Sequence, residues 1–176
     1  LLTHFGVSGP AVLDMSRHWL HLREEDPAAQ IRVSWMPEHD EAAIDAWLRS
    51  APDTRLVTHL AERLPRRLAT VLLEMAAVDG ELRGAHLPKA ERRRILELVA
   101  RQPLPVTDPR GWSYAEVTAG GVPLSEIHLD RLESRRCPGL HLCGEILDVD
   151  GRIGGFNFQW AWASGLLAGR SAVASA

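Results

Sequence analysis

The sequence predicts an α/β protein, α+β in the part present here, in which two ends with strand character enclose a helical middle. Residues 139–165 have the pattern of a short apolar strand, a loop of glycines and carboxylates, and a helix. Residues 40–101 contain four apolar patterns at helical spacing, separated by proline and glycine turns. We therefore expect the middle to be an insertion into a larger α/β domain, so that residues 1–13 and 103–176 meet in space.

The composition of the 176 residues is that of an ordinary globular protein, with 45% hydrophobic residues, 24% charged residues and a net charge of -3. This balance gives no electrostatic reason to expect a nucleic acid or an anionic membrane as a partner. No apolar run approaches the ~20 residues that cross a bilayer. Cys137 and Cys143 form no CxxC pair and no secretory leader is recognisable, so we expect no disulfide framework and a cytoplasmic protein.

The first segment leads from a loop into a helix. Ser8 is the expected N-cap, and Pro10 falls near the first helical position, where its missing N–H costs nothing. Residues 31–35 then alternate apolar and polar side chains as a short strand that Pro37 ends. The chain begins at Leu1, inside an apolar segment, and contains no GxGxxG turn, so we expect it to be the C-terminal piece of a longer polypeptide.

Each helix of the middle has its own start signal: Asp40, Thr54, Pro65 and Pro88 in turn. Charges of both signs alternate along these helices, which is typical of a solvated surface. A nucleic-acid site would need a net basic face, and glutamates lie among the arginines. The arginines in question are Arg63, Arg66, Arg67 and Arg92 to Arg94, and the glutamates are Glu62, Glu74, Glu91 and Glu97.

Two glycine-containing loops in the last third suggest a ligand. Residues 119–122 form a paired-glycine turn that permits positive φ and close backbone approach. The apolar run 139–143 is followed by residues 144–155, which hold glycines and carboxylates and precede a helix with small residues at helical spacing. A strand, such a loop and a helix N-terminus let backbone N–H groups and the helix dipole approach a phosphate. A bound nucleotide cofactor is therefore the first hypothesis. The small residues are Ala161, Ser164, Gly165 and Ala168.

Three segments together resemble the HI0933-like flavoproteins, a bacterial family of FAD-dependent, NAD(P)-linked oxidoreductases with aminoacetone oxidase-like members. These segments are residues 3–11, 116–122 and 144–165, and residues 132–135 also resemble the family's Met-Glu-Ser-Lys stretch. The resemblance implies the C-terminal part of a Rossmann-type FAD-binding domain with an inserted helical subdomain.

This resemblance also implies a division of the chain and a function. Residues 1–38 would end an inserted β region and carry the first helix of the site, residues 39–102 would form the helical insertion, and residues 103–176 would belong to the FAD-binding domain. The parent protein would move hydride or electrons between NAD(P)H, or a small organic substrate such as an amine, and the flavin. The missing N-terminal half would be a partner, and the chain alone would be inactive. The alternative is a non-catalytic helical interaction or lid module without its own cofactor site.

In such flavoproteins a carboxylate after the last strand reaches the ribityl chain or pyrophosphate of FAD. Asp148 is that carboxylate here and Glu145 is the second candidate, since an ionised carboxylate accepts hydrogen bonds from hydroxyls at the end of a strand where ligands bind. Phe156 stands where family members usually have Tyr. The implied cofactor-binding set is Gly120, Gly121, Gly144, Glu145, Asp148, Gly154, Gly155, Phe156 and Asn157, with Thr3, His4, Gly6 and Ser8 on its border.

Simpler explanations stand beside these roles. Taken alone, Asp148 and Asp150 fit a solvated Asp-Gly turn. His4 is better explained as a loop histidine than as a catalytic base, and His141 with Cys143 matches no zinc spacing. We therefore expect no metal and assign no catalytic residue. We also expect weak FAD binding by the isolated chain, because several charge-assisted hydrogen bonds of about 1.5–3 kcal/mol each would be missing.

Overall fold

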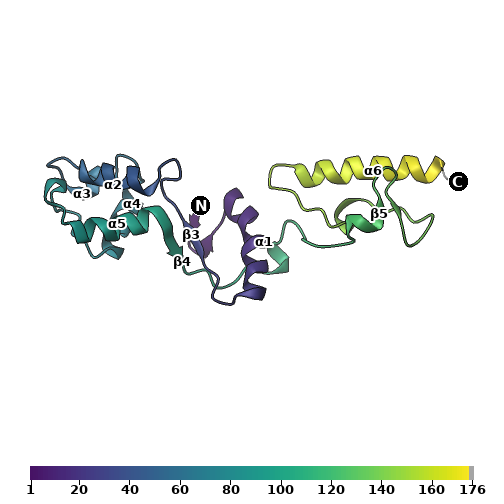
Figure 1. The fold of residues 1–176 in the computed structure, drawn as a ribbon, viewed down its shortest axis with the longest axis horizontal. Helices are drawn as coiled ribbons and strands as arrows, with labels where there is room; N and C mark the ends of the chain where they lie inside the picture. The colour runs from purple at the N-terminus through teal and green to yellow at the C-terminus, as the bar shows by residue number, and fades with distance from the viewer. Residues whose placement is uncertain (175–176) are drawn as a thin grey trace. The chain divides into compact units, whose positions relative to one another are not determined.

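The computed structural model describes residues 1–174, which divide into two compact units. The helical unit is Gln30–Val106, and the terminal unit joins Leu1–Ala29 to the segment that starts at Thr107 (Figure 1). The two ends of the chain thus belong to one unit, as expected if the helical middle is an insertion. The helical unit is wider than the expected segment 39–102, because a strand on each side of the helices pairs with the other.

That pairing is a short antiparallel ribbon in the helical unit. Strand β3 (Ile31–Val33) lies beside β4 (Gln102–Leu104), with Ile31 opposite Leu104. Between them the chain forms four α-helices and one 3-10 turn within the described residues. These are α2 (Glu41–Arg49), α3 (Leu56–Leu60), α4 (Arg66–Met75), η1 (Gly84–His86) and α5 (Lys89–Arg101).

Three of the four predicted helix starts are confirmed. The Asp40 carboxylate accepts a hydrogen bond from the Ala43 N–H at 2.7 Å, and Pro65 and Pro88 stand directly before α4 and α5. The prediction for Thr54 is wrong, because α3 begins only at Leu56. The Thr54 carbonyl instead accepts a hydrogen bond from the Gly84 N–H, so this residue belongs to a pairing with the η1 segment.

The helical unit closes around a continuous apolar core. Fifteen buried residues from α2 to α5 and their connections form one cluster, which satisfies the amphipathic patterns seen in the sequence. Those with at most 1% exposure include Ile44, Leu48, Leu56, Leu60, Leu72, Leu73, Ile95 and Val99.

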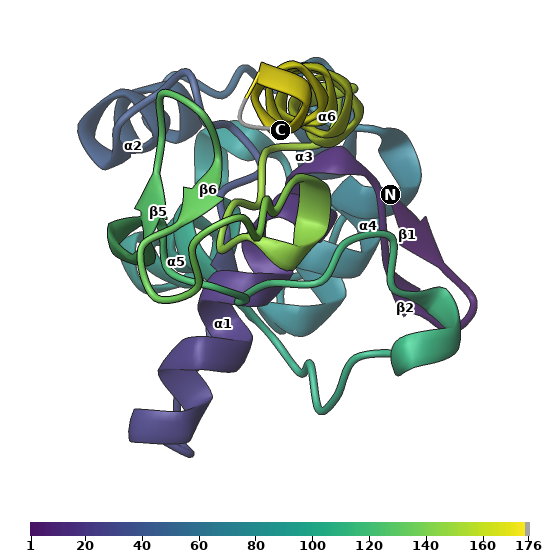
Figure 2. The ribbon, with the colours of Figure 1, turned by 90° about the vertical axis from the view of Figure 1, so that its right-hand side faces the viewer.

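The terminal unit is built from short elements and two longer helices. Its first part is the hairpin β1 (Leu2–Thr3) and β2 (Gly6–Val7), followed by α1 (Pro10–Glu25). Its second part contains the hairpin β5–β6 and ends in α6, which Figure 2 shows end-on. The second-part elements are η2 (Trp112–Tyr114), η3 (Leu124–Glu126), β5 (Ile127–His128), β6 (Glu133–Ser134), η4 (Gly144–Ile146) and α6 (Phe156–Ala174).

The core of this unit is small. Ile127, Leu132, Leu147 and Ala168 form its buried cluster. The predicted strand at residues 139–143 is wrong, since only a single bridge joins His141 to Glu133. A buried strand needs a neighbour on each side, and within residues 1–174 this segment has one.

Two further predictions concern the start of α1 and the thiols. Pro10 is the first helical residue as predicted, but the N-cap is Gly9 rather than Ser8, and no side chain caps the helix. Ser8 exchanges two backbone hydrogen bonds with Leu1, so it extends the β1–β2 hairpin instead. Cys137 and Cys143 are both free thiols. Across residues 1–174, no helix combines the length and the apolar character needed to cross a bilayer.

Candidate functional site

The paired-glycine turn and the carboxylate loop lie side by side in the terminal unit. The Val122 N–H donates to the Ile146 carbonyl at 2.8 Å, and the Asp148 N–H donates to the Val122 carbonyl at 3.0 Å. These two bonds form a parallel bridge between segments that are separated by the β5–β6 hairpin in the sequence. Two motifs that were recognised separately are therefore one structural feature.

Glycine is required where the two segments touch. Gly121 has a φ of 136°, and a Cβ there would lie 2.5 Å from the Ile146 carbonyl oxygen. Gly120 has a φ of 91°, but a Cβ there would meet no atom within 4 Å. Gly121 thus permits the bridge, while Gly120 presents backbone to open space.

The two candidate carboxylates have different surroundings. Glu145 accepts a hydrogen bond from the Thr118 N–H at 2.6 Å, so it fixes the glycine turn to η4. Asp148 is exposed, and within residues 1–174 its carboxylate has no hydrogen-bond or ion-pair partner. Asp148 is therefore the carboxylate with all of its acceptor capacity available to a ligand, and Glu145 positions the loop.

Helix α6 holds the carboxylate loop through two hydrogen bonds to Gly144. The Ser164 hydroxyl accepts from the Gly144 N–H at 2.9 Å, and the Trp160 indole N–H donates to the Gly144 carbonyl at 3.0 Å. Both backbone groups of Gly144 are thus satisfied by α6. Ser164 and Ala168 are buried, as expected for small residues that allow close approach, whereas Ala161 is exposed. Trp160 packs against the core of the terminal unit, but Trp162 is 70% exposed.

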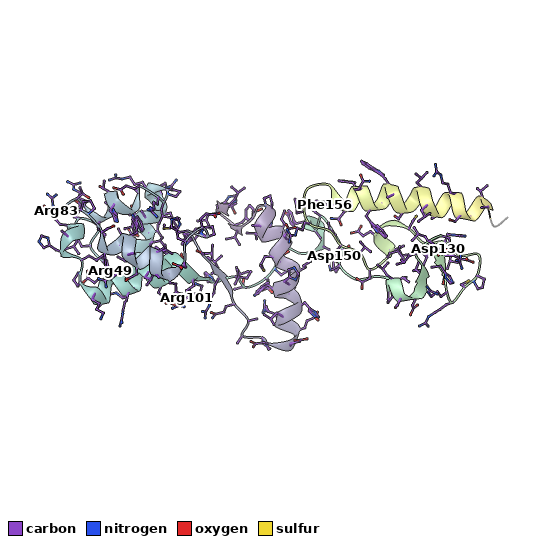
Figure 3. All side chains as sticks on the ribbon, turned by 45° about the horizontal axis from the view of Figure 1, so that its top comes forward. Arg49, Arg83, Arg101, Asp130, Asp150 and Phe156 are labelled. Atoms are coloured by element: carbon purple, nitrogen blue, oxygen red, sulfur yellow. The ribbon has the colours of Figure 1, made fainter. Side chains whose placement is uncertain are left out.

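The loop that leads into α6 is held by Asn157. Its side-chain amide accepts from the Gly151 N–H at 2.7 Å and donates to the Gly151 carbonyl at 3.1 Å. The contact of Asn157 with a cofactor stays a prediction, and in this structure its side-chain amide is bonded to the loop. Gly154 and Gly155 have φ values of 124° and 91°, and Phe156, labelled in Figure 3 at the start of α6, is 62% exposed.

Helix α1 reaches the same loop through two polar contacts. The Arg17 guanidinium donates to both the side chain and the backbone carbonyl of Asp150, and the Ile153 N–H donates to the Asp14 carboxylate at 2.8 Å. Asp150 therefore has a structural partner, unlike Asp148. Sequence reasoning missed Asp14 and Arg17, because more than 130 residues separate them from the loop and no local pattern marks such a pair.

The four border residues of the first segment are not tied to this loop. The Thr3 hydroxyl donates to the Gly6 carbonyl at 2.9 Å within its own hairpin, and the His4 and Phe5 rings lie nearly perpendicular with their centroids 5.2 Å apart. In the part of the chain that the structure describes, no hydrogen bond joins Thr3, His4, Gly6 or Ser8 to residues 118–122 or 144–157. Their contact with a cofactor stays a prediction.

The arrangement presents a hydrogen-bond acceptor beside accessible backbone. The unpartnered carboxylate of Asp148 can accept hydrogen bonds from the hydroxyl groups of a ligand. Added Cβ atoms at the exposed Gly120 and Gly155 would meet nothing within 4 Å, so backbone is accessible at these two positions. No group of metal-binding side chains occurs within the described residues.

Comparison with known proteins identifies relatives over nearly the whole chain. The family model described as HI0933-like protein Rossmann domain matches residues 21–171. A 3-dehydro-bile acid delta(4,6)-reductase of Clostridium scindens is 35% identical over 98% of this chain and 43% of its own length. Ribosomal RNA dihydrouridine synthases of Haemophilus influenzae and Escherichia coli are 35% and 32% identical over 93% and 99% of this chain, and 39% and 42% of their own lengths. The chain thus spans about two fifths of these curated relatives.

Proposed function

We propose a function from one premise, which is that this chain belongs to the HI0933-like family and carries its Rossmann domain. The proposal is that the parent protein is an FAD-dependent oxidoreductase and that this chain is its C-terminal portion. The parent would move hydride or electrons between NAD(P)H, or a small organic substrate, and FAD. Family membership and the reductase among the relatives support oxidoreductase chemistry in general terms.

The observation that carries the proposal is the free Asp148 carboxylate beside an open glycine edge. Bound FAD would supply the hydride chemistry at this edge. The chain's own residues would bind and orient it: Asp148 would accept hydrogen bonds from the ribityl hydroxyls, and Gly120 would let backbone approach the ring. The N-terminus of α6 would favour negative charge on the adjacent ring edge.

The residues that hold this edge would position the cofactor and would take no part in the reaction. Glu145 holds the glycine turn, and α6 holds Gly144 through Trp160 and Ser164. Asn157 shapes the loop before α6. These bonds keep the carboxylate and the open backbone in one place, which reduces the conformational freedom that cofactor binding would otherwise remove.

The names of the relatives narrow the substrate that we propose. One is named a delta(4,6)-reductase and two are named dihydrouridine synthases. Both names describe the addition of hydrogen to an unsaturated compound. For this chain we therefore propose that a carbon–carbon double bond receives a hydride that originates from NAD(P)H and a proton from solvent. The substrate is either a small unsaturated ring compound or a uridine in RNA.

The test is to purify the parent protein and this chain and to record their absorption spectra. We expect stoichiometric flavin absorption from the parent and none from the chain. Anaerobic addition of NADH or NADPH should then bleach the flavin of the parent. A correctly folded parent that never retains flavin would overturn the proposal, and so would tight FAD binding by a parent whose Asp148 and glycine edge can be replaced without effect.

A further inference from the structure

Residues 150–153 are held in place by side chains of two helices. They lie between Asp148 and α6 and belong to no helix or strand. From α6, the Asn157 amide bonds to both backbone groups of Gly151, at 2.7 and 3.1 Å. A Cβ added at Gly151 would lie 2.9 Å from the Cβ of Phe156. The segment is therefore packed tightly against the start of α6.

Helix α1 holds the same segment through two of its side chains. Nη1 of Arg17 donates to the Asp150 carbonyl at 2.8 Å and also to the carboxylate of Asp150, a residue that Figure 3 labels. One turn earlier, the Asp14 carboxylate accepts from the Ile153 N–H at 2.8 Å. The side chains of Arg17 and Asp150 are 33% and 22% exposed, so solvent screens their ion pair only in part. Residues three apart share a face of a helix, so one face of α1 bonds to both ends of the segment.

The position of residues 150–153 decides how two parts of the site stand relative to each other. Before the segment lies the free carboxylate of Asp148, whose backbone N–H is bonded to the Val122 carbonyl at 3.0 Å. After it lie the accessible backbone of Gly155 and the first turn of α6. A ligand that contacts both parts binds more tightly when the segment between them is already ordered, because binding then removes less conformational freedom.

We infer that Arg17 and Asp14 are positioning residues for FAD. They hold residues 150–153, and their loss weakens FAD binding through that segment. The inference rests on the proposed function and adds to it two residues outside the three segments that resemble the family. Neither side chain is assigned a contact with a reacting atom, so neither is a catalytic residue.

Arg23 provides a matched control on the same helix. Its side chain is 34% exposed, close to the 33% of Arg17. Like Arg17, it contacts a backbone carbonyl and an aspartate of a distant segment, in this case those of Thr107 and Asp108. Removal of Arg23 therefore loosens α1 but leaves the bonds to residues 150–153 in place. A comparison of the two arginines separates a loss of stability from a loss of positioning.

The test uses the FAD-bound parent protein, from which flavin is removed and titrated back while its fluorescence is recorded. We expect Arg17→Ala to weaken FAD binding about tenfold and Arg23→Ala to weaken it by less than about twofold. Both should lower the thermal stability of the FAD-free protein. Arg17→Lys should stay within about threefold of the wild type, because a single nitrogen of Arg17 makes both bonds and an ammonium group can replace it.

Asp14 gives a second pair of variants. Asp14→Ala removes the acceptor of the Ile153 N–H and should weaken FAD binding about threefold to tenfold. Asp14→Asn keeps an acceptor oxygen and should stay within about twofold of the wild type. Hydrogen exchange of the FAD-free parent reports on the segment itself. The amides of residues 150–155 should exchange faster in Arg17→Ala and Asp14→Ala, and at the wild-type rate in Arg23→Ala.

Two results would overturn the inference while the proposed function stands. One is equal weakening of FAD binding by Arg17→Ala and Arg23→Ala, which would mean that α1 acts through stability alone. The other is wild-type affinity for FAD in both Arg17→Ala and Asp14→Ala. A folded wild-type parent that never binds FAD would instead overturn the proposed function and this inference with it. The two kinds of failure are distinguishable, because the wild-type titration is part of the same experiment.

Discussion

The two units of this chain differ in how completely they bury their own apolar residues. The helical unit has fifteen buried residues in one cluster and exposes only Val71 and Met75 among the large apolar residues that the structure describes as exposed. The terminal unit has four buried residues in its cluster and sixteen exposed large apolar residues, among them Phe158, Trp162 and Leu166 on α6.

This difference separates a unit that buries its own apolar residues from one that leaves many of them exposed. Helices α2 to α5 bury one another's apolar side chains, whereas α6 has few apolar neighbours within residues 1–174. A helix of a Rossmann domain packs on a parallel sheet, and a sheet of that kind requires more strands than the two-residue hairpins seen here. We expect the remaining part of the parent protein to cover the exposed face of α6.

The largest expected effect of a single substitution lies in the helical core. Leu72 is fully buried, so Leu72→Ala should lower the free energy of unfolding of the helical unit by about 2–5 kcal/mol. Val71→Ala, at a half-exposed neighbour in the same helix, should change it by less than about 0.5 kcal/mol. Urea titration of this chain measures both. Equal effects of the two substitutions would contradict the described core.

A leucine-to-alanine substitution in α6 sharpens the comparison between the two units. Leu166→Ala should leave the stability of this chain within about 0.5 kcal/mol of the wild type, because the side chain is 59% exposed here. In the parent protein the same substitution should cost about 2–5 kcal/mol if the face is covered. Thermal unfolding of the two proteins tests this, and an identical small effect in both would argue against a covered face.

The next effect concerns the bridge between the glycine turn and the carboxylate loop. Gly121→Ala should destabilise the terminal unit by about 1–3 kcal/mol from backbone strain, and more from the close contact with the Ile146 carbonyl. Flavin should be lost from the parent protein in parallel. Gly120→Ala is the matched control for stability alone, because it introduces a strained φ without a steric clash within the chain. Thermal unfolding of this chain measures both variants, and equal destabilisation by the two substitutions would refute the bridge.

Sequence reasoning succeeded where the signal is local. Asp40 caps α2, Pro10, Pro65 and Pro88 stand at helix starts, and the glycine pair at 120–121 adopts positive φ. Each of these depends on a few neighbouring residues. The family membership was also readable, since it requires only the order and spacing of short motifs.

Reasoning from sequence failed where a side chain or backbone group finds its partner outside its own motif. Nothing near Asp150 indicates that Arg17 binds it, and nothing near Asn157 indicates that its amide is used by Gly151. Ser8 had the residue type of an N-cap, yet hairpin pairing with Leu1 determined its conformation. The sequence also does not predict that the Asp148 carboxylate lacks a partner. Several carboxylates are present, and the sequence does not show which of them forms a hydrogen bond or an ion pair.

The contrast between Asp148 and Asp150 gives a smaller and more specific prediction. Asp148→Asn should weaken FAD binding by the parent about tenfold to a hundredfold and leave the thermal stability of the FAD-free protein unchanged, since no partner in the described residues is lost. Asp150→Asn should lower thermal stability, because the pair with Arg17 is broken. Flavin titration and thermal unfolding of both variants are needed. If Asp148→Asn retained FAD with wild-type affinity, the assignment of this carboxylate would be wrong.

The smallest expected effect is the acid sensitivity of each unit. The hydrogen bond from Arg92, with the charges of Arg92 and Arg49, lowers the pKa of Asp45 in the helical unit. In the terminal unit, the hydrogen bond from Arg131 and then that from the Gly139 N–H lower the pKa of Glu133. A lowered folded-state pKa means that the stabilisation is complete above the ordinary values of about 3.8 and 4.5, and that it is lost as the pH falls below them.

Each unit should therefore have its own carboxylate whose removal reduces its acid sensitivity. Hydrogen exchange between about pH 5 and pH 3 can follow the two units separately. Asp45→Asn should flatten the pH dependence of protection in the helical unit alone, and Glu133→Gln should do so in the terminal unit alone. Both effects should be smaller than those above, because solvent screens pairs near the surface. If either substitution changed the acid response of both units equally, the units would not be independent, and the contrast between them would fail.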